Sequence, residues 1–249
     1  MKGIVLTAGR GSRLGAATED RPKALVRIEG RTLLDRQIAA LQFAGAGEVG
    51  VVVGWKAETF SGFSLPMFEN PQWATTSMVD SLACASDWLR SSDCLICYGD
   101  IIFSRADAHR LASTSADLAI SYDPAWLAMW RCRFADPLSD AETFCRDDAG
   151  RLVEIGQRAA DPSDISGQYL GLLRTTPVGW AEMDQVRNTA PAGRPRDMTD
   201  LLNLVVQAQR IPVWTIPVQD PWWEFDIPAD LLNGAVRVRA IDLSERCNG

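Results

Sequence analysis

Short apolar runs alternate with helical patterns over the first half of this chain. Four runs have the composition of strands, namely KGIVLTA (2–8), EVGVVVG (48–54), CLICYGD (94–100) and LAISY (118–122). Between the first two, Leu34, Ile38 and Leu41 recur at helical spacing, and a second such pattern predicts one helix over 76–90. Strand and helix therefore alternate over 2–122, as in a mostly parallel sheet with helices on both faces.

The second half of the chain adds strands of another kind. ETFCRDDAGRLVEIG (142–156) has a DDAG turn between two short strand-like runs, which predicts a hairpin. A strand is expected at GQYLGLL (167–173), a helix from Met198 to Val205, and further strands at IPVWTIPV (211–218) and WWEFD (222–226) that complete the sheet. We therefore predict an α/β fold with a three-layer architecture and a mixed, mostly parallel sheet.

Length and composition fit a single domain of this class. The chain has 249 residues, 47% of them hydrophobic, which is enough for one sizeable core. We expect one domain over 1–249, with a nucleotide-binding half over about 1–122 and an acceptor-binding half over about 123–235 on the same sheet.

Charge narrows the class of ligand. The net charge of -7 argues against a general nucleic-acid or membrane binder, so neither is expected as a partner. Residues 1–40 carry eight basic and four acidic groups, a net of +4, so the remaining chain carries -11. A positive segment in an acidic protein suits a small polyanion better than a long one.

The start, MKGIVLTAG, is too short for a signal peptide, and no apolar stretch approaches the length of a membrane span. We expect a cytoplasmic protein. Cys94 and Cys97 lie in a predicted strand that points them to opposite faces, so buried thiols are favoured over a disulfide or redox pair. The chain has one histidine, His109, which disfavours a zinc site; a metal here would be a hard ion held by carboxylates.

A glycine-rich loop follows the first predicted strand directly. It reads LTAGRGSRLG (6–15), and its three glycines allow backbone N–H groups to converge on an anion. Arg13 lies inside the loop and Lys23 follows it, and such cations suit a triphosphate. The loop fits neither the dinucleotide fingerprint, because Leu14 takes the third glycine position, nor the Walker motif. Taken alone, it is equally compatible with an ordinary turn bearing solvated arginines.

Three carboxylates are candidate metal ligands. Asp100 ends a buried strand, where ligands bind in open α/β sheets; capping of the next helix is the alternative, but Ser104 is better placed as that cap. Glu224 and Asp226 are two residues apart, so a strand would place both on one face. Asp226 is also compatible with a capping role, because Pro228 suits the first turn of a helix. With phosphate oxygens and water, these side chains would complete a Mg²⁺ site, in which Glu224 is a third ligand or an orienting group.

The motif LTAGRGSRLG…RPKAL closely resembles the signature of the nucleotide-sugar pyrophosphorylase-like nucleotidyltransferases. The chain departs from the pattern at Gly15, where many members have a larger residue. The resemblance implies a Rossmann-like fold of the nucleotide-diphospho-sugar transferase type and a loop that wraps the triphosphate. It implies that Arg13 and Lys23 stabilise the α-phosphate region, and that GD at the strand end and a late E-x-D hold the metal.

The segment ENPQWATTSMVDSLACASDWL (69–89) resembles the phosphocholine cytidylyltransferases of bacterial choline incorporation, and the likeness extends over about 2–232. Relatives of this branch include enzymes that act on phosphonates. The resemblance implies Mg²⁺-dependent transfer of NMP from an NTP, with CTP favoured, to a small phosphate- or phosphonate-bearing acceptor, with release of pyrophosphate. The residues it implies for the nucleotide are Leu6, Ala8, Gly9, Gly11, Ser12 and Ser81.

Residues for the acceptor are less well defined by the sequence. Trp130 and Arg133 lie near each other on a predicted helix, where a tryptophan face suits a cation and a guanidinium suits a phosphate. Core packing of the tryptophan and solvation of the arginine are the alternatives. Asp140 and Glu142 are candidates for binding an amine or hydroxyl groups, and solvated loop carboxylates are equally consistent.

Other functions remain open at this stage. A sugar-1-phosphate or cyclitol-phosphate nucleotidylyltransferase would use another NTP such as GTP. A regulatory module without activity would have little need of Arg13, Lys23, Asp100 and Asp226 together. A glycosyltransferase would favour D-x-D at the strand end, where this chain has a single acid. The sequence is compatible with a homodimer and does not identify the acceptor.

Overall fold

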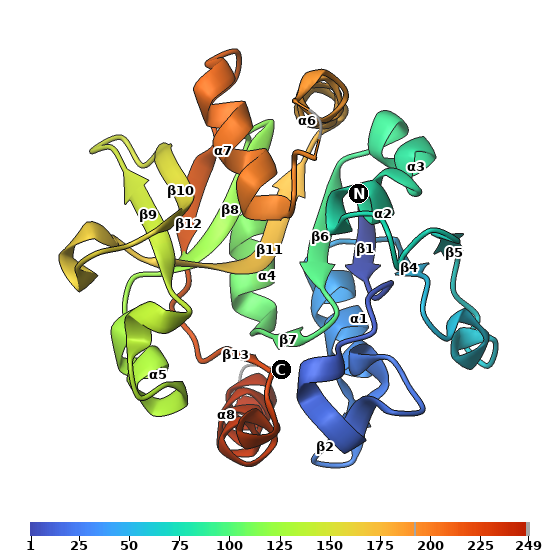
Figure 1. Ribbon diagram of the computed structural model, residues 1–249. Helices are drawn as coiled ribbons and strands as arrows, with labels where there is room; N and C mark the ends of the chain where they lie inside the picture. Colours follow the sequence, from blue (N-terminus) through green and yellow to red (C-terminus); the bar gives the residue numbers. More distant parts are fainter. Residues whose placement is uncertain (192, 248–249) are drawn as a thin grey trace.

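A seven-stranded sheet runs through the molecule in the order β12-β8-β11-β6-β1-β4-β5 (Figure 1). The computed structural model describes residues 1–191 and 193–247. The strands of this sheet are β1 (Lys2–Leu6), β4 (Glu48–Val53), β5 (Met67–Glu69), β6 (Cys94–Tyr98), β8 (Leu118–Asp123), β11 (Gln168–Thr175) and β12 (Trp214–Pro217). Strands from both halves of the chain therefore belong to one sheet.

Three short ladders complete the β-structure. They are β2 (Arg27–Ile28) with β3 (Arg31–Thr32), β7 (Ile101–Ile102) with β13 (Trp223–Glu224), and β9 (Glu142–Arg146) with β10 (Leu152–Arg158). In the main sheet β11 is antiparallel to both of its neighbours, and the other pairs are parallel. The predicted mixed, mostly parallel sheet is confirmed, and so is the hairpin of β9 and β10.

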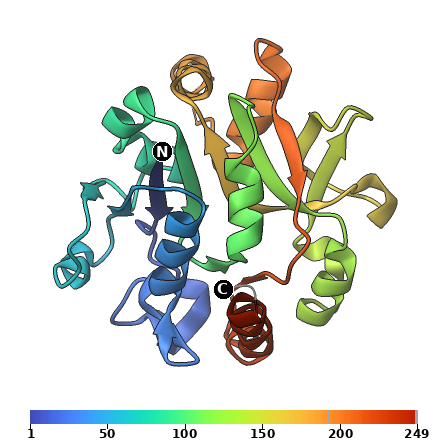
Figure 2. The same cartoon turned by 180° about the vertical axis from the view of Figure 1, so that it is seen from behind.

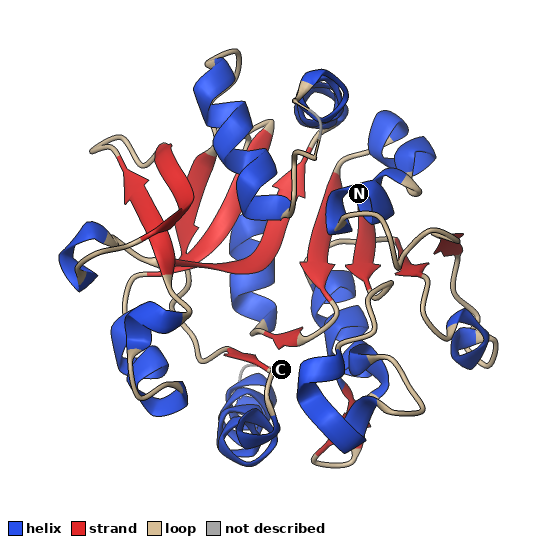
Figure 3. Cartoon of the chain, viewed as in Figure 1, coloured by secondary structure: helices blue, strands red, loops and turns tan. Residues whose placement is uncertain are grey.

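Helices cover both faces of the sheet (Figure 3). The α-helices are α1 (Leu33–Phe43), α2 (Met78–Ala83), α3 (Ser86–Ser91), α4 (Arg105–Ala112), α5 (Trp126–Arg133), α6 (Pro177–Thr189), α7 (Met198–Ala208) and α8 (Pro228–Cys247). The 3-10 helices are η1 (Ser12–Thr18), η2 (Lys23–Leu25), η3 (Ala57–Phe60), η4 (Pro137–Ser139) and η5 (Pro162–Asp164). Figure 2 shows α1 and α4 side by side on one face, while α2, α3, α6 and α7 contact one another on the other.

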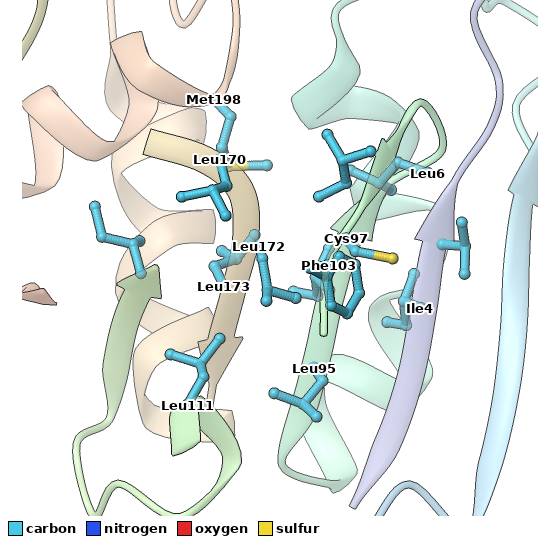
Figure 4. Packing of buried hydrophobic residues seen from close by; sticks show 14 of the residues in the cluster. Ile4, Leu6, Leu95, Cys97, Phe103, Leu111, Leu170, Leu172, Leu173 and Met198 are labelled. Atoms are coloured by element: carbon cyan, nitrogen blue, oxygen red, sulfur yellow. The ribbon is translucent and has the colours of Figure 1, made fainter. Parts of the chain in front are cut away.

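The core lies between the sheet and these two helical layers. Figure 4 shows side chains of β1, β6 and β11, among them Ile4, Leu95 and Leu172, packed with Leu111 of α4 and Met198 of α7. Burial on both faces explains why the parallel strands are continuous apolar runs and not alternating ones.

One predicted helix is two helices. The spacing of apolar residues predicted one helix over 76–90, but the helix breaks after Ala83 and restarts at Ser86. The hydroxyl of Ser86 donates to the carbonyl of Ala83, so a side chain takes an acceptor that a continuous helix would give to a backbone N–H.

The prediction that WWEFD completes the sheet was wrong. β12 pairs with β8 at the sheet edge, but the chain then leaves the sheet, and β13 pairs only with β7. The backbone N–H groups of Gln219 and Asp220 donate to the buried carboxylate of Asp107, which anchors the departing segment. WWEFD is thereby carried past the carboxyl ends of β1 and β6, beside α8 (Figure 1).

Several local predictions agree with the structure. Ser104 caps α4 through its side chain, as expected. Cys94 and Cys97 are buried free thiols, and burial raises the pKa of Cys94 to about 12. Within the part of the chain that the structure describes, no helix is long and apolar enough to cross a membrane.

The core predicts a clear difference between two truncations. Leu173 of β11 is fully buried, so Leu173→Ala should lower the free energy of unfolding by about 2–5 kcal/mol. Val153 is 53% exposed, and Val153→Ala should change it by less than about 0.5 kcal/mol. Urea denaturation measures both values; equal losses in the two variants would contradict this description of the core.

Candidate active site

The glycine-rich loop bends sharply at two positions after β1. Gly11 and Gly15 have φ of +62° and +65°, a region that glycine adopts without the strain of a side chain. The buried hydroxyl of Thr18 bonds to the carbonyl oxygens of both glycines, 3.0 Å and 3.2 Å away. The loop is therefore fixed by its own sequence, and η1 and η2 follow it along the same edge of the sheet.

Lys23 lies between two carboxylates from distant parts of the chain. Its Nζ is 2.9 Å from Oδ2 of Asp100 and 2.6 Å from Oδ1 of Asp226. Arg13 adds a second cation, with Nη1 2.9 Å from Oδ2 of Asp226. The side chain of Asp226 is 5% exposed, whereas that of Arg13 is 68% exposed, so the cluster extends from the interior to the surface.

Backbone pairing brings the two aspartates together. Asp100 follows β6 and precedes β7, and the N–H of Phe225, next to Asp226, donates to the carbonyl of Asp100 at 2.8 Å. The buried amide of Gln37 on α1 donates to the carbonyls of Tyr98 and Ile101, which fixes the turn that carries Asp100. The meeting of the two aspartates therefore depends on the short β7–β13 ladder.

The electrostatics of the cluster follow from burial and charge. Burial alone would lower the pKa of Lys23, but the carboxylates of Asp100 and Asp226 outweigh it and raise that pKa above its ordinary value. Lys23 is therefore held charged. Burial, together with the charge of Asp100, raises the pKa of Glu224 to about 7 against the opposing effect of Arg133.

The two aspartates fit a divalent cation. Both aspartates direct carboxylate oxygens at one position, which the ammonium of Lys23 occupies. Oxygen ligands of this kind are those that Mg²⁺ prefers. The described residues contain no group of three or more acidic, histidine or cysteine side chains arranged for a metal. A metal bound by these aspartates would therefore need further oxygen ligands from elsewhere, such as phosphate groups and water.

A cavity of about 210 Å³ opens between the loop and the end of β6. Of the residues predicted for a nucleotide, Leu6, Gly9 and Gly11 line it, as do Arg13, Lys23 and Asp100.

The other three residues predicted for a nucleotide do not line this cavity. Ala8 is buried and accepts a backbone bond from Trp55, and Ser12 is exposed. Ser81 is buried, and its hydroxyl accepts a hydrogen bond from Asn70. Through this bond, Ser81 supports the 70–77 segment.

A second cavity of about 280 Å³ adjoins the first, and Arg13, Met78 and Tyr98 line both. Trp130, Asp140 and Glu142, which the sequence suggested for an acceptor, all lie in its wall. The remaining lining residues are Gln168, Tyr169, Leu170, Asp197, Thr199, Trp222 and Glu224.

The second cavity is acidic and aromatic. Among the described residues that line it, Asp140, Glu142, Asp197 and Glu224 are acidic and Arg13 is basic. Burial raises the pKa of Glu142 above its ordinary value. This wall suits a ligand that carries a positive charge.

Arg133 does not line either cavity, contrary to the sequence-based suggestion that it contacts an acceptor. Its side chain is 1% exposed, and its guanidinium binds Asp230 and Glu224. Asp230 was not expected from the sequence, nor were Tyr98 and Tyr169 in the second cavity. Asp230 had a detectable signal, because an acid in the first turn after Pro228 is typical of a helix start.

Comparison with known proteins gives consistent results. The profile of the MobA-like NTP transferase domain matches residues 3–160. A CTP:phosphoglutamine cytidylyltransferase from Campylobacter jejuni is 34% identical over 184 residues, which cover 70% of this chain and 72% of that protein. A 2-aminoethylphosphonate cytidylyltransferase from Lancefieldella rimae is 27% identical over 169 residues, which cover 66% of this chain and 64% of that protein.

The fold is shared with a solved structure, the CTP:phosphocholine cytidylyltransferase from Streptococcus pneumoniae. The TM-score is 0.69 at 18% identity, and the match covers 95% of this chain and 98% of that one. At this level of identity the likeness shows the fold alone. Together with the sequence matches, it confirms the resemblance inferred from the loop motif and from residues 69–89.

The loop geometry predicts the effect of one methyl group. A Cβ at Gly11 would lie 2.4 Å from Cγ of Lys23, so Gly11→Ala should displace Lys23 as well as strain the backbone. Isothermal titration with inorganic tripolyphosphate should show binding weakened about tenfold or more, as for loss of one charge-assisted contact.

Gly30→Ala is the matched control for this prediction. Gly30 has φ of +80° and no atom within 4 Å of its Cβ position, so the variant carries comparable backbone strain without the clash. It should bind tripolyphosphate like the unchanged protein. If both variants bind equally well, the loop does not act through Lys23.

Proposed function

The chain belongs to the MobA-like NTP transferase family and is a nucleotidyltransferase, and we propose that it transfers CMP from CTP to a small phosphate- or phosphonate-bearing acceptor, with release of pyrophosphate. The acceptor proposed here also carries a positively charged amino group. The two relatives named above act on phosphoglutamine and on 2-aminoethylphosphonate, and both use CTP or form a CMP derivative according to their names.

The observation that carries this proposal is the pairing of two cavities beside the Lys23, Asp100 and Asp226 cluster: Lys23 and Asp100 line the first, and Arg13, which pairs with Asp226, lines both. The first cavity has the loop, Arg13 and Lys23 in its wall, which suits a triphosphate. The second is acidic and aromatic, which suits a cationic acceptor. Arg13 lines both, so it is placed where the two substrates would meet.

In the proposed reaction, a phosphate or phosphonate oxygen of the acceptor attacks the α-phosphorus of CTP. The bond from the α-phosphorus to its bridging oxygen breaks, and that oxygen leaves as part of pyrophosphate. The attacking oxygen is already anionic, so the reaction needs neither a covalent enzyme intermediate nor a general base. Arg13 and Lys23 offset the charge on the α-phosphate and on the departing pyrophosphate, and loop N–H groups bind the β- and γ-phosphates.

Mg²⁺ is the cofactor that we propose, with Asp100 and Asp226 as its protein ligands. When bound, it would supply Lewis-acid stabilisation of the phosphoryl oxygens. Glu224 is assigned an orienting role, because its Oε2 accepts a hydrogen bond from Arg133 at 2.7 Å.

The second cavity supports an amino-bearing acceptor. A partly buried carboxylate such as Glu142 gains from pairing with a cation, and the faces of Trp130 and Trp222 attract an ammonium group. Because CTP is an intracellular metabolite, we propose that the enzyme works in the cytoplasm, where its free thiols remain reduced.

A screen of the four NTPs against a panel of acceptors tests the reaction. With Mg²⁺, pyrophosphate release should be fastest with CTP and an amino-bearing phosphate or phosphonate. Asp100→Ala should lower turnover about 100-fold or more, because a catalytic metal contributes several kcal/mol. Asp148→Ala, at an exposed turn residue, is the control and should retain full activity.

Two results would contradict the proposal. Turnover by Asp100→Ala at the unchanged rate would remove the metal assignment. A preference for GTP and a sugar-1-phosphate or cyclitol phosphate would assign the alternative activity instead.

Acceptor recognition is tested by a pair of phosphonates. Glu142→Gln should raise KM for 2-aminoethylphosphonate about tenfold through loss of one charge-assisted contact, and leave KM for CTP unchanged. KM for ethylphosphonate, which has no amine, should hardly change. Steady-state kinetics measure these values, and an equal effect on both phosphonates would show that Glu142 does not bind the amine.

The same contact predicts a pH dependence. The carboxyl group of Glu142 is ionised above its pKa, which burial raises, and neutral below it. KM for 2-aminoethylphosphonate should therefore increase as pH falls, starting at a higher pH than an ordinary glutamate would give. Glu142→Gln should lose this part of the pH profile.

A further inference from the structure

We propose that Arg133 and Asp230 are positioning residues that fix the carboxylate of Glu224 and the backbone of Asp226 beside the proposed divalent cation. This inference rests on the proposed function, because it concerns the same metal. It differs from the sequence-based interpretation, in which Arg133 was a candidate for acceptor contact.

The geometry is that of a buried fork. Nε of Arg133 is 3.0 Å from Oδ1 of Asp230, and Nη2 is 3.0 Å from Oδ2. The third nitrogen, Nη1, donates to Oε2 of Glu224 at 2.7 Å. All three nitrogens of the guanidinium are therefore used, and their planar arrangement fixes the two acidic residues relative to each other.

Asp230 continues this network to Asp226. Its Oδ2 accepts the backbone N–H of Asp226 at 2.9 Å and that of Ile227 at 3.0 Å. Asp230 is the third residue of α8, so bonds to N–H groups just before the helix are partly those of a helix cap. A cap does not need an arginine, however, and it is Arg133 that links this helix start to Glu224.

Burial indicates that the network has a purpose beyond stability. The side chains of Arg133 and Asp230 are 1% and 0% exposed. Removing both charges from water is costly, and a well-packed neutral pair often serves stability equally well or better. The guanidinium offsets this cost through its bonds to Asp230 and Glu224. In the proposed chemistry, these bonds hold groups beside the metal in position, as outer-shell partners of metal ligands do.

The same guanidinium also contacts the wall of the second cavity. Its central carbon lies 5.5 Å from the ring centroid of Trp130, which lines that cavity, and 5.9 Å from that of Trp223 in β13. Helix α5, which carries Arg133, is therefore joined through one side chain to Glu224 and, by way of Asp230, to the backbone of Asp226. A substitution at Arg133 should therefore disturb the metal site more than the phosphate loop, because the bonds of its guanidinium are to Asp230 and Glu224.

The decisive variant is Arg133→Met combined with Asp230→Asn. It removes both buried charges together and keeps an oxygen at position 230 that can accept the backbone N–H groups. It should fold with a urea midpoint close to that of the unchanged protein. Arg133→Lys keeps the charge but not the planar fork, and should have an intermediate effect on the metal.

The readout is direct binding of Mn²⁺, followed by the electron paramagnetic resonance signal of the free ion. The titration is made with the non-cleavable α,β-methylene analogue of CTP bound, so no turnover is needed. The dissociation constant for Mn²⁺ should rise about 10- to 100-fold in the double variant, as for loss of an outer-shell partner. Arg174→Lys, at a buried arginine that binds Asp93, is the control and should leave that constant unchanged.

The outcomes separate this inference from the proposed function. If the unchanged protein binds Mn²⁺ and the folded double variant binds it equally well, the positioning role is wrong and the proposed function stands. If the unchanged protein binds no Mn²⁺ with the analogue present, both are wrong. A double variant that unfolds while Arg133→Lys folds and binds Mn²⁺ normally would assign the fork to stability alone.

Discussion

The ion pairs of Lys23 with Asp100 and Asp226 are the interaction on which the site depends. Two carboxylates brought together in a partly buried site repel each other, so they stay together only with a cation between them. The β7–β13 ladder brings them to one place, and Lys23 offsets the charge that results. The two cavities share Arg13, Met78 and Tyr98 in their walls, and Arg13 pairs with Asp226, so the proposed triphosphate and acceptor sides meet next to this cluster.

The sequence predicted the sheet, most helices and the convergence of Asp100 with Asp226, because strand ends and glycine turns are local signals with a known consequence in space. It did not predict that Lys23 bridges the aspartates, since no spacing in the chain relates residues 23, 100 and 226. WWEFD was assigned to the sheet because its composition is that of a strand; the bonds of Asp107 that divert it come from α4. Arg133 was misinterpreted for the same reason, as its partner Asp230 lies 97 residues away.

The second cavity shows even more clearly what the sequence alone does not predict. Its acidic residues come from the residue after η4, from β9, from the start of α7 and from β13, so no segment of the sequence contains the feature that characterises it. Asp140 and Glu142 were recognised as candidates, but Tyr98 and Trp222 join them only because β6 and the segment before β13 meet in the fold. The substrate preference proposed for this cavity rests on the combined charge of its wall, which depends on topology.

Charge balance constrains how the two substrates enter. Asp100 and Asp226 bear two negative charges, and Lys23 and Arg13 neutralise them. A triphosphate attracts both cations strongly, but if they moved to it alone, the largely buried Asp226 would be left unpaired at a high cost. In the proposed reaction, the nucleotide would therefore arrive with a replacement cation for the aspartates. An uneven distribution of charge, with basic groups concentrated in residues 1–40 and acids in the rest, thus favours the proposed binding of a triphosphate together with its metal.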